Sequence, residues 1–266
     1  MKSIAAFAKL SAVVLVTLGC YAFFIIGCGV LKLLGVSHGK WRNICLMSWG
    51  KLASASLSIK VATKGPVPEP PFFLVSNHLS YVDIIVLFSR LKTTFVSKKE
   101  VAEWPVIGFI AKSIGIVFID RTNRKDLKRV NQEISNAVSA HMGLTLFPEG
   151  TTSPGKDILR FRPSLLKYPA QSELGAHYCT LHYETGHTQE KDDAYISVCW
   201  WDDSELGSHL WNLAKKTNIH ATISFGDKAI HENDRKILSE KLHKEASGIF
   251  SPVCKKTDLE FEPIQL

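Results

Sequence analysis

The residues best suited to chemistry are His78 and Asp83, which lie five positions apart in the segment V-S-N-H-L-S-Y-V-D. The imidazole of histidine titrates near neutral pH, so His78 is a candidate general base that takes a proton from a hydroxyl group. Asp83 can accept a hydrogen bond from one ring nitrogen, which fixes the tautomer and stabilises the imidazolium. This requires His78 in a turn and Asp83 in the first turn of the following helix. A structural role is the alternative, because Ser80 and Asp83 have the spacing of a helix capping box.

Two further apolar runs end in polar residues. Arg121 follows the run 115–119, and a guanidinium there can clamp a phosphate through paired N–H donors. The alternative is an ordinary surface ion pair between Asp120 and Arg121. The run 144–147 ends in the turn P-E-G-T-T-S, in which Gly150 can take a positive φ and Thr151 offers a hydroxyl. Taken alone, this turn would be interpreted as an ordinary connection after a strand.

Short β-rich runs alternate with helical patterns from residue 57 onwards, which predicts an α/β fold. The expected strands are 57–63, 72–76, 93–97, 116–119, 144–147, 178–183, 194–200 and 221–225. The expected helices are 81–91, 105–114, 124–141, 204–217 and 234–250. We therefore expect a mixed, largely parallel sheet flanked by helices. His78 then follows the carboxyl end of a strand, where α/β folds build their sites.

Together, the three polar segments resemble the lysophosphatidic-acid acyltransferase family, the glycerolipid acyltransferases that include 1-acyl-glycerol-3-phosphate acyltransferases. The motif N-H-x-x-x-x-D, a strand ending in I-D-R and the motif F-P-E-G-T occur in this order, and the resemblance covers roughly residues 57–230. It implies that His78 is the catalytic base and that Asp83 orients it. The substrate-binding residues that it implies are Lys98, Arg121, Glu149, Gly150 and Thr151.

The resemblance implies transfer of a fatty acyl chain from acyl-CoA or acyl-carrier protein to a hydroxyl of a lysoglycerolipid. The expected acceptor is 1-acylglycerol-3-phosphate, which gives phosphatidic acid, and no cofactor is expected besides the acyl donor. Thr152 stands where the family often has an arginine, which leaves lysophosphatidylcholine-type and ornithine-type lysolipids open as acceptors. A catalytically silent lipid-binding membrane protein is the alternative from a different class.

Residues 10–31 contain no charged side chain, and 22 helical residues span about 33 Å, enough to cross the hydrocarbon core of a bilayer. We expect an uncleaved membrane anchor, since a secretory signal has a shorter apolar region. Lysines and arginines after the run outnumber those before it, which predicts a catalytic domain facing the cytoplasm from an inner or cell membrane. A re-entrant pair of helices in one leaflet has the same composition and stays open.

Residues 39–57 show helical periodicity, with two tryptophans on an apolar face and basic residues elsewhere. Such a helix suits a membrane interface, and packing on the soluble domain is the alternative. The expected apolar face consists of Trp41, Ile44, Cys45, Trp49 and Leu52. This predicts an anchor at 1–36, an amphipathic linker helix and first strand at 37–64, and an acyltransferase domain at 65–266.

The chain has 266 residues, a net charge of +7 and six cysteines without C-x-x-C spacing. The positive charge favours a partner with an acidic surface, and no nucleic-acid motif accompanies it, so anionic lipid is favoured over nucleic acid. The cysteine pattern favours reduced, mostly buried residues over zinc ligands. The expected partners are therefore a membrane, a lipid acceptor and an acyl donor.

Overall fold

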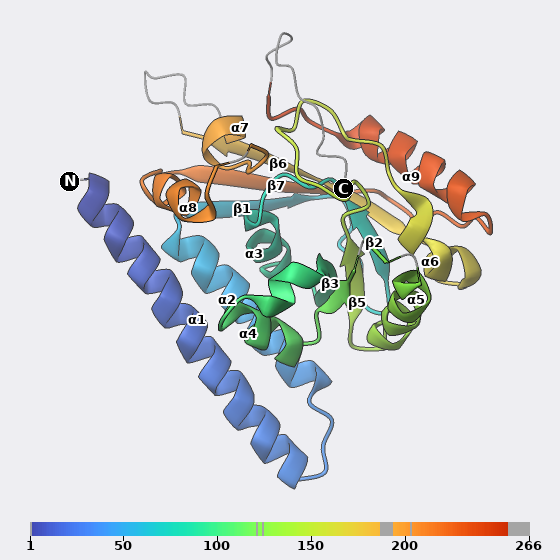
Figure 1. Cartoon of the computed structure of the whole chain (residues 1–266), viewed down its shortest axis with the longest axis horizontal. Helices are drawn as coiled ribbons and strands as arrows, with labels where there is room; N and C mark the ends of the chain where they lie inside the picture. The colour runs from blue at the N-terminus through green and yellow to red at the C-terminus, as the bar shows by residue number, and fades with distance from the viewer. Residues whose placement is uncertain (1, 121, 124, 187–193, 203, 255–266) are drawn as a thin grey trace.

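The computed structural model describes residues 2–120, 122–123, 125–186, 194–202 and 204–254. It has a mixed sheet with helices on both faces and a long helical hairpin at the N-terminus (Figure 1). The predicted fold class, a largely parallel α/β sheet flanked by helices, is confirmed. The helix predicted from residues 10–31 is also present and is longer than expected.

The sheet contains seven strands in the order β1-β7-β6-β2-β5-β3-β4 among the described residues. Their bounds are β1 Ile59–Lys64, β2 Phe73–Ser76, β3 Thr93–Lys98, β4 Val117–Ile119, β5 Gly143–Leu146, β6 His177–Thr185 and β7 Ile219–Phe225. Strands β2 to β6 run parallel to one another, because β2 pairs in parallel with β5 and β6, and β3 pairs in parallel with β4 and β5. Only the pair β1 and β7 runs the other way, since β7 is antiparallel to β6.

Two hydrophobic cores lie on the two faces of the sheet. One is formed with α2, α3 and α8, and the other with α5, α6 and α9. The alternation of side chains along a strand explains this division, since Leu74 of β2 belongs to the first core and Phe73 and Val75 to the second. The helix bounds are α1 Lys2–Leu33, α2 Gly39–Ser56, α3 Val82–Phe88, α4 Ile107–Ser113, α5 Asp126–Ala137, α6 Lys167–Gln171, α7 Ala194–Ser197, α8 Leu206–Ala214 and α9 Arg235–Ile249, with 3₁₀ turns at η1 Lys99–Glu103 and η2 Pro163–Leu165.

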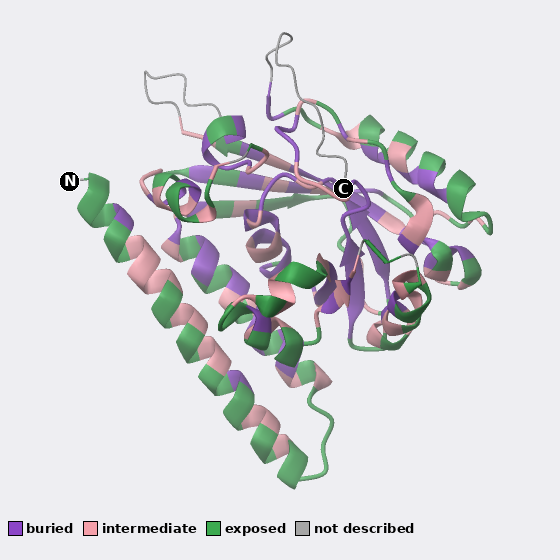
Figure 2. Ribbon diagram, viewed as in Figure 1, coloured by how far each residue is buried: buried purple, intermediate pink, exposed green. Residues whose placement is uncertain are grey.

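Helices α1 and α2 form a hairpin along one side of the molecule (Figure 1). Two tryptophans of α2 bind it to α1: Trp41 Nε1–H donates to the carbonyl of Phe24 at 3.1 Å, and Trp49 Nε1–H donates to Thr17 Oγ1 at 3.0 Å. Most of the surface of α1 remains uncovered (Figure 2). By length and composition, α1 is the one described helix that can cross a membrane.

The predicted strand 194–200 is wrong. Residues Ala194–Ser197 form the short helix α7, in which the N–H groups of Val198 and Cys199 both donate to the carbonyl of Ala194. The β-prone composition of this segment misled the prediction. Strand β6 is already flanked by β2 and β7, so Tyr195, Val198 and their neighbours pack on the face of the sheet instead.

The helix predicted at 39–57 is present as α2, but its buried side differs from the predicted apolar face. Ile44 and Leu52 are exposed, whereas Arg42 is buried. Packing against α3 sets this orientation, because a Cβ at Gly50 would come within 2.4 Å of the backbone nitrogen of Ser89. One side of α2 therefore packs on the domain, as in the alternative to a helix at the membrane interface.

Candidate active site

The candidate site residues come from the carboxyl ends of neighbouring parallel strands. His78 follows β2, Glu149 follows β5, and Lys98 ends β3, in the order in which these strands lie in the sheet. Because the strands are parallel, these ends share one edge of the sheet, the usual place for a site in an α/β fold. The first and third motifs are also joined directly, since the N–H of Ser153 donates to the carbonyl of His78 at 3.0 Å.

His78 and Asp83 form a hydrogen-bonded pair. His78 Nδ1 lies 2.7 Å from Asp83 Oδ2, the His78 side chain is 22% exposed, and the Asp83 side chain is fully buried. A carboxylate can only accept a hydrogen bond, so Nδ1 of His78 carries a hydrogen and donates the hydrogen bond to Asp83. This tautomer leaves Nε2 of His78 free to accept a proton, as a general base must.

The same carboxylate holds the start of helix α3. Asp83 Oδ2 also accepts from the N–H groups of Leu79, at 2.8 Å, and Ser80, at 3.1 Å. The Ser80 hydroxyl accepts in turn from the N–H of Val82 at 3.3 Å. The two interpretations of Ser80 and Asp83 are therefore compatible, because one carboxylate binds the histidine and orders the turn that carries it.

Aromatic side chains fix the plane of the His78 ring. The rings of His78 and Phe147 stack with centroids 4.0 Å apart and an interplanar angle of 14°, and Phe147 lies parallel to Phe95 beyond it at 6.0 Å. Phe147 is the phenylalanine of F-P-E-G-T. This aromatic residue therefore supports the catalytic candidate directly, a contact that the sequence did not reveal.

Two residues without a predicted role complete the surroundings of the pair. The side chain of Asn77 bonds both backbone groups of Leu181: its Oδ1 accepts from N–H at 2.7 Å and its Nδ2 donates to the carbonyl at 3.2 Å. The hydroxyl of Tyr183 donates to Asp83 Oδ1 at 2.7 Å. Asn77 stands beside His78 in the motif, but nothing in the sequence connects Tyr183, one hundred positions away, to Asp83.

Glu149 lies in the third motif with both carboxylate oxygens buried and no hydrogen-bond partner of ordinary geometry among the described residues. Burial raises the pKa of this carboxyl group well above its usual value, and the charge of Asp83 adds to the effect. The backbone N–H groups of His78 and Leu159 lower the pKa by less than burial raises it. The protonated, neutral form of Glu149 is therefore favoured.

The turn after Glu149 positions the other residues of the third motif. Gly150 has φ of +77°, which glycine adopts at little cost, and a Cβ there would lie 3.5 Å from the guanidinium carbon of Arg162. Thr151 is half-buried. The hydroxyl of Thr152 donates to the carbonyl of Trp200, so it binds a neighbouring loop at the position where the family often has an arginine.

The cationic candidates lie further along the edge. Lys98 is exposed at the end of β3, two strands from β2. Its neighbour Lys99 forms an ion pair with Asp120 at 3.1 Å, and hydrogen bonds from Thr122 and Lys99 lower the pKa of Asp120 to about 2. Arg121 lies outside the described residues, so its predicted phosphate contact stays a prediction.

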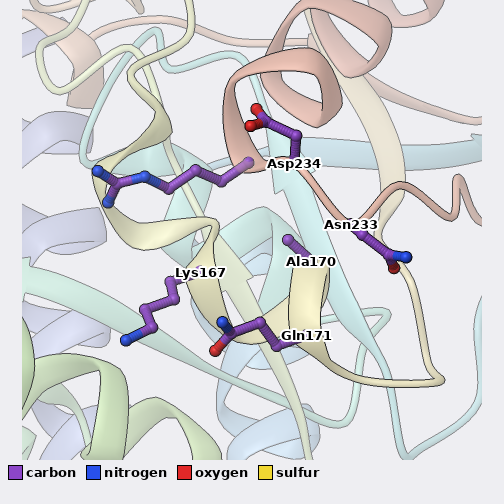
Figure 3. A pocket seen from close by; sticks show the side chains of 6 residues that line it. Lys167, Ala170, Gln171, Asn233 and Asp234 are labelled. Atoms are coloured by element: carbon purple, nitrogen blue, oxygen red, sulfur yellow. The ribbon is translucent and has the colours of Figure 1, made fainter.

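A surface hollow lies elsewhere, between α6 and the start of α9 (Figure 3). The Asp234 side chain in its wall accepts from the N–H groups of Lys236 and Ile237 and so caps α9. None of the predicted site residues that the structure describes lines this hollow. The residues around it are Lys167, Ala170, Gln171, Asn233, Asp234 and Arg235.

Comparison with known proteins agrees with the fold and with the motifs. Residues 58–182 match the family described as Acyltransferase. The chain is 28% identical over 226 residues to a 1-acyl-sn-glycerol-3-phosphate acyltransferase of Neisseria gonorrhoeae, a match that covers 82% of this chain and 86% of that protein. It is also 28% identical over 220 residues to a lyso-ornithine lipid O-acyltransferase of Brucella abortus, with 79% and 82% covered.

A solved structure has the same fold. The 1-acyl-sn-glycerophosphate acyltransferase PlsC of Thermotoga maritima aligns with a TM-score of 0.59 and 19% identity, over 94% of this chain and 98% of that one. The resemblance inferred from the three motifs is confirmed, and residues 58–182 form an acyltransferase domain. The chain is an O-acyltransferase of lipid metabolism.

Proposed function

We propose that the protein transfers a fatty acyl chain from a thioester donor, acyl-CoA or acyl-carrier protein, to a hydroxyl of a lysoglycerolipid, with His78 as the general base. The observation that carries this proposal is the 2.7 Å contact between His78 Nδ1 and Asp83 Oδ2. It combines a buried carboxylate with a partly exposed imidazole at the carboxyl edge of the sheet. A lipid hydroxyl is too weak an acid to attack a thioester quickly without such a base.

The reaction needs no covalent enzyme intermediate. Nε2 of His78 takes the proton of the acceptor hydroxyl while the oxygen attacks the thioester carbonyl carbon. The C–S bond then breaks, and the leaving thiolate takes the proton back from the imidazolium, which yields an ester and a free thiol. Asp83 stabilises the imidazolium between the two proton transfers.

The first candidate acceptor is 1-acylglycerol-3-phosphate, with phosphatidic acid as the product. The relative from Neisseria gonorrhoeae carries this acceptor in its name. Lys98 lies two strands from β2, about 10 Å along the sheet edge at ~4.8 Å per strand. A long lysine side chain can bind a phosphate placed between these two points while the acceptor hydroxyl meets His78.

The second candidate acceptor is a lyso-ornithine lipid, whose headgroup carries no phosphate. Thr152 favours it, because this residue binds the carbonyl of Trp200 and brings no positive charge to the third motif. The Brucella abortus relative is named for this activity. The guanidinium of Arg162 beside Gly150 argues in the other direction, since it returns a cation to this part of the edge.

Release of free thiol from an acyl-CoA, measured with a panel of lysolipids, tests the proposal. We expect turnover with one lysolipid class and a ~10²–10⁴-fold loss in His78→Ala. His220→Ala, at an exposed histidine of β7, is the matched control and should retain activity. Normal turnover in a folded His78→Ala protein would exclude His78 as the base. Absence of thiol release with every lysolipid would exclude these acceptors with acyl-CoA as the donor.

We also propose that α1 lies in one leaflet as half of a re-entrant hairpin. Support comes from contacts along its length: Lys9 Nζ donates to the carbonyl of Lys216, and Tyr21 packs edge-on against Phe109. These positions are about 18 Å apart along the helix, so a perpendicular α1 would carry parts of the domain into the hydrocarbon. Protease access to an N-terminal tag in sealed vesicles tests this, because a hairpin places the tag on the same side as the catalytic domain.

A further inference from the structure

Strand β6 delivers one tyrosine to each face of the sheet. Tyr183 belongs to the core that contains α3, and Tyr178 belongs to the core on the opposite face. Both side chains are buried, Tyr183 to 1% exposure. The alternation of side chains along the strand therefore points only Tyr183 towards the helix that carries Asp83.

Asn77 sets the register that brings Tyr183 to Asp83. The ladder between β2 and β6 ends with Ser76 opposite Cys179. Beyond this point, the side-chain amide of Asn77 bonds both the N–H and the carbonyl of Leu181, as the next backbone rung would. This pair of hydrogen bonds fixes β6 against the turn that contains His78. It holds β6 at Leu181, which lies two residues before Tyr183.

The two oxygens of Asp83 have different surroundings. Oδ2 accepts from His78, Leu79 and Ser80, whereas Tyr183 is the only donor to Oδ1 in the described part of the chain. A buried carboxylate without donors on one oxygen is costly. Burial and the charge of Asp83 raise the pKa of the Tyr183 hydroxyl well above its usual value, so this group stays protonated and donates.

We propose that Tyr183 is a positioning residue of the acyl transfer: its hydroxyl keeps the Asp83 carboxylate ionised and oriented, and so keeps His78 in the tautomer that serves as a base. This role rests on the proposed function of His78. Tyr183 does not touch the reacting atoms and acts only through Asp83. Without its hydroxyl, the potential at Asp83 and His78 becomes more negative, and both groups retain protons to higher pH.

Other titratable groups face Asp83 and remain in place when Tyr183 is changed. The third motif contributes Glu149, β6 contributes a thiol, and the segment after α7 contributes another. These three groups are Glu149, Cys179 and Cys199. The hydrogen-bonded partners of Asp83 are His78 and Tyr183. The thiols and Glu149 have raised pKa values, first because of burial, which favours their neutral forms.

The test is the pH profile of kcat/KM for Tyr183→Phe, with Tyr178→Phe as the control from the opposite face of the same strand. We expect the acid limb of Tyr183→Phe to move up by about one to two pH units, the equivalent of one hydrogen bond to a charged acceptor. On the acid side, kcat/KM of Tyr183→Phe should be about 10- to 100-fold lower than that of the unchanged protein. At alkaline pH the two values should approach one another. KM for the acceptor should change less than about twofold, and Tyr178→Phe should keep the original profile.

An unchanged profile in Tyr183→Phe overturns the proposal, and so does an equal loss of rate at every pH, which indicates a structural role. If Tyr183→Phe does not fold, the test uses 3-fluorotyrosine at position 183. The fluorinated phenol is a stronger hydrogen-bond donor, so the acid limb should move to lower pH. An acid limb that does not move overturns the proposal. His78→Ala separates the two levels. Activity in His78→Ala refutes the proposed function, whereas an inactive His78→Ala with a normal Tyr183→Phe refutes only the role of Tyr183.

Discussion

Glu149 shows how a motif residue can act through burial. The resemblance implies that it binds substrate, a role that stays a prediction, while the structure buries both of its carboxylate oxygens without a hydrogen bond of ordinary geometry among the described residues. Its carboxyl group lies close enough to Asp83 for the two negative charges to oppose one another. A neutral Glu149 removes this repulsion.

Replacement of Glu149 by glutamine should therefore change the pH dependence of stability. The pKa of Glu149 in the folded state is raised above its usual value of 4.5, so its stabilising contribution is complete below about pH 4.5 and is lost as the pH rises through the raised value. Glutamine cannot ionise, so the Tm of Glu149→Gln should exceed that of the unchanged protein increasingly as the pH rises from about 4.5 towards the raised value. Each kcal/mol of difference corresponds to roughly 2–4 °C.

Thermal unfolding at a series of pH values checks this prediction. Glu100→Gln, at an exposed glutamate of η1, is the matched control and should leave the pH dependence unchanged. Parallel curves for Glu149→Gln and the unchanged protein would mean that Glu149 is as easily ionised in the folded as in the unfolded state.

At the same scale, the sequence predicted the paired residues and missed their supports. His78 and Asp83 are close in the chain, so one turn and one helix start suffice to join them. Tyr183 reaches Asp83 only because β6 pairs with β2 across one hundred positions, and Thr152 reaches Trp200 across 48. Such contacts depend on strand order, which the local pattern of polar and apolar residues does not encode.

At the scale of elements, prediction succeeded where hydrophobic periodicity and sheet membership agree. Strands β2, β3 and β5 are buried along almost their whole length and were placed within a residue or two. The segment 194–200 has the composition of a strand, but β6 before it already has a neighbour on each side, and the segment forms α7 instead. The buried side of α2 was predicted only in part: Trp41, Cys45 and Trp49 pack on the core, whereas the charge of Arg42 placed this buried residue outside the predicted face.

Arg42 connects the helical hairpin to the acyltransferase domain. Its Nε–H donates to the carbonyl of Ile114 at 2.6 Å, at the carboxyl end of α4, and a second guanidinium nitrogen contacts Met142 Sδ next to β5. Carbonyls at the end of a helix lack intrahelical partners, so a buried guanidinium there satisfies one of them and meets the negative end of the helix dipole. The segment after α4 leads through β4 to the candidate residue Arg121.

Arg42→Ala should destabilise the protein by about 2–4 kcal/mol, because it leaves a cavity and an unpaired carbonyl at Ile114. Urea unfolding of the detergent-solubilised protein measures this change. Lys51→Ala, at an exposed position of the same helix, should stay within about 0.5 kcal/mol of the original stability. Equal stability for Arg42→Ala and Lys51→Ala would show that the contact with α4 contributes nothing to the fold.

At the scale of the whole molecule, the exposed apolar side chains gather on α1 and on the start of α4. On α4, Ile107 and Phe109 are 51% and 66% exposed, and the contact between Phe109 and Tyr21 makes the two surfaces continuous. The exposed large apolar residues of α1 are Ile4, Phe7, Val14, Leu15, Leu18, Phe23, Ile25, Ile26, Val30 and Leu33. An apolar surface of this extent on a lipid enzyme fits a bilayer better than water.

If this surface meets the membrane, α4 contributes to binding beside the anchor. The double change Ile107→Ser and Phe109→Ser should lower partitioning into anionic vesicles by about tenfold or more, since each fully inserted side chain is worth ~1.5–3 kcal/mol and these two insert only in part. KM for an acceptor presented in vesicles should rise, while turnover of a short-chain, water-soluble acceptor should not change, because neither side chain belongs to the His78 pair. Ile237→Ser, at an exposed isoleucine of α9 on the other face of the sheet, is the control and should bind vesicles normally. Equal partitioning of the double variant and Ile237→Ser would restrict the membrane contact to the hairpin, and α4 would then be an exposed apolar turn without a part in binding.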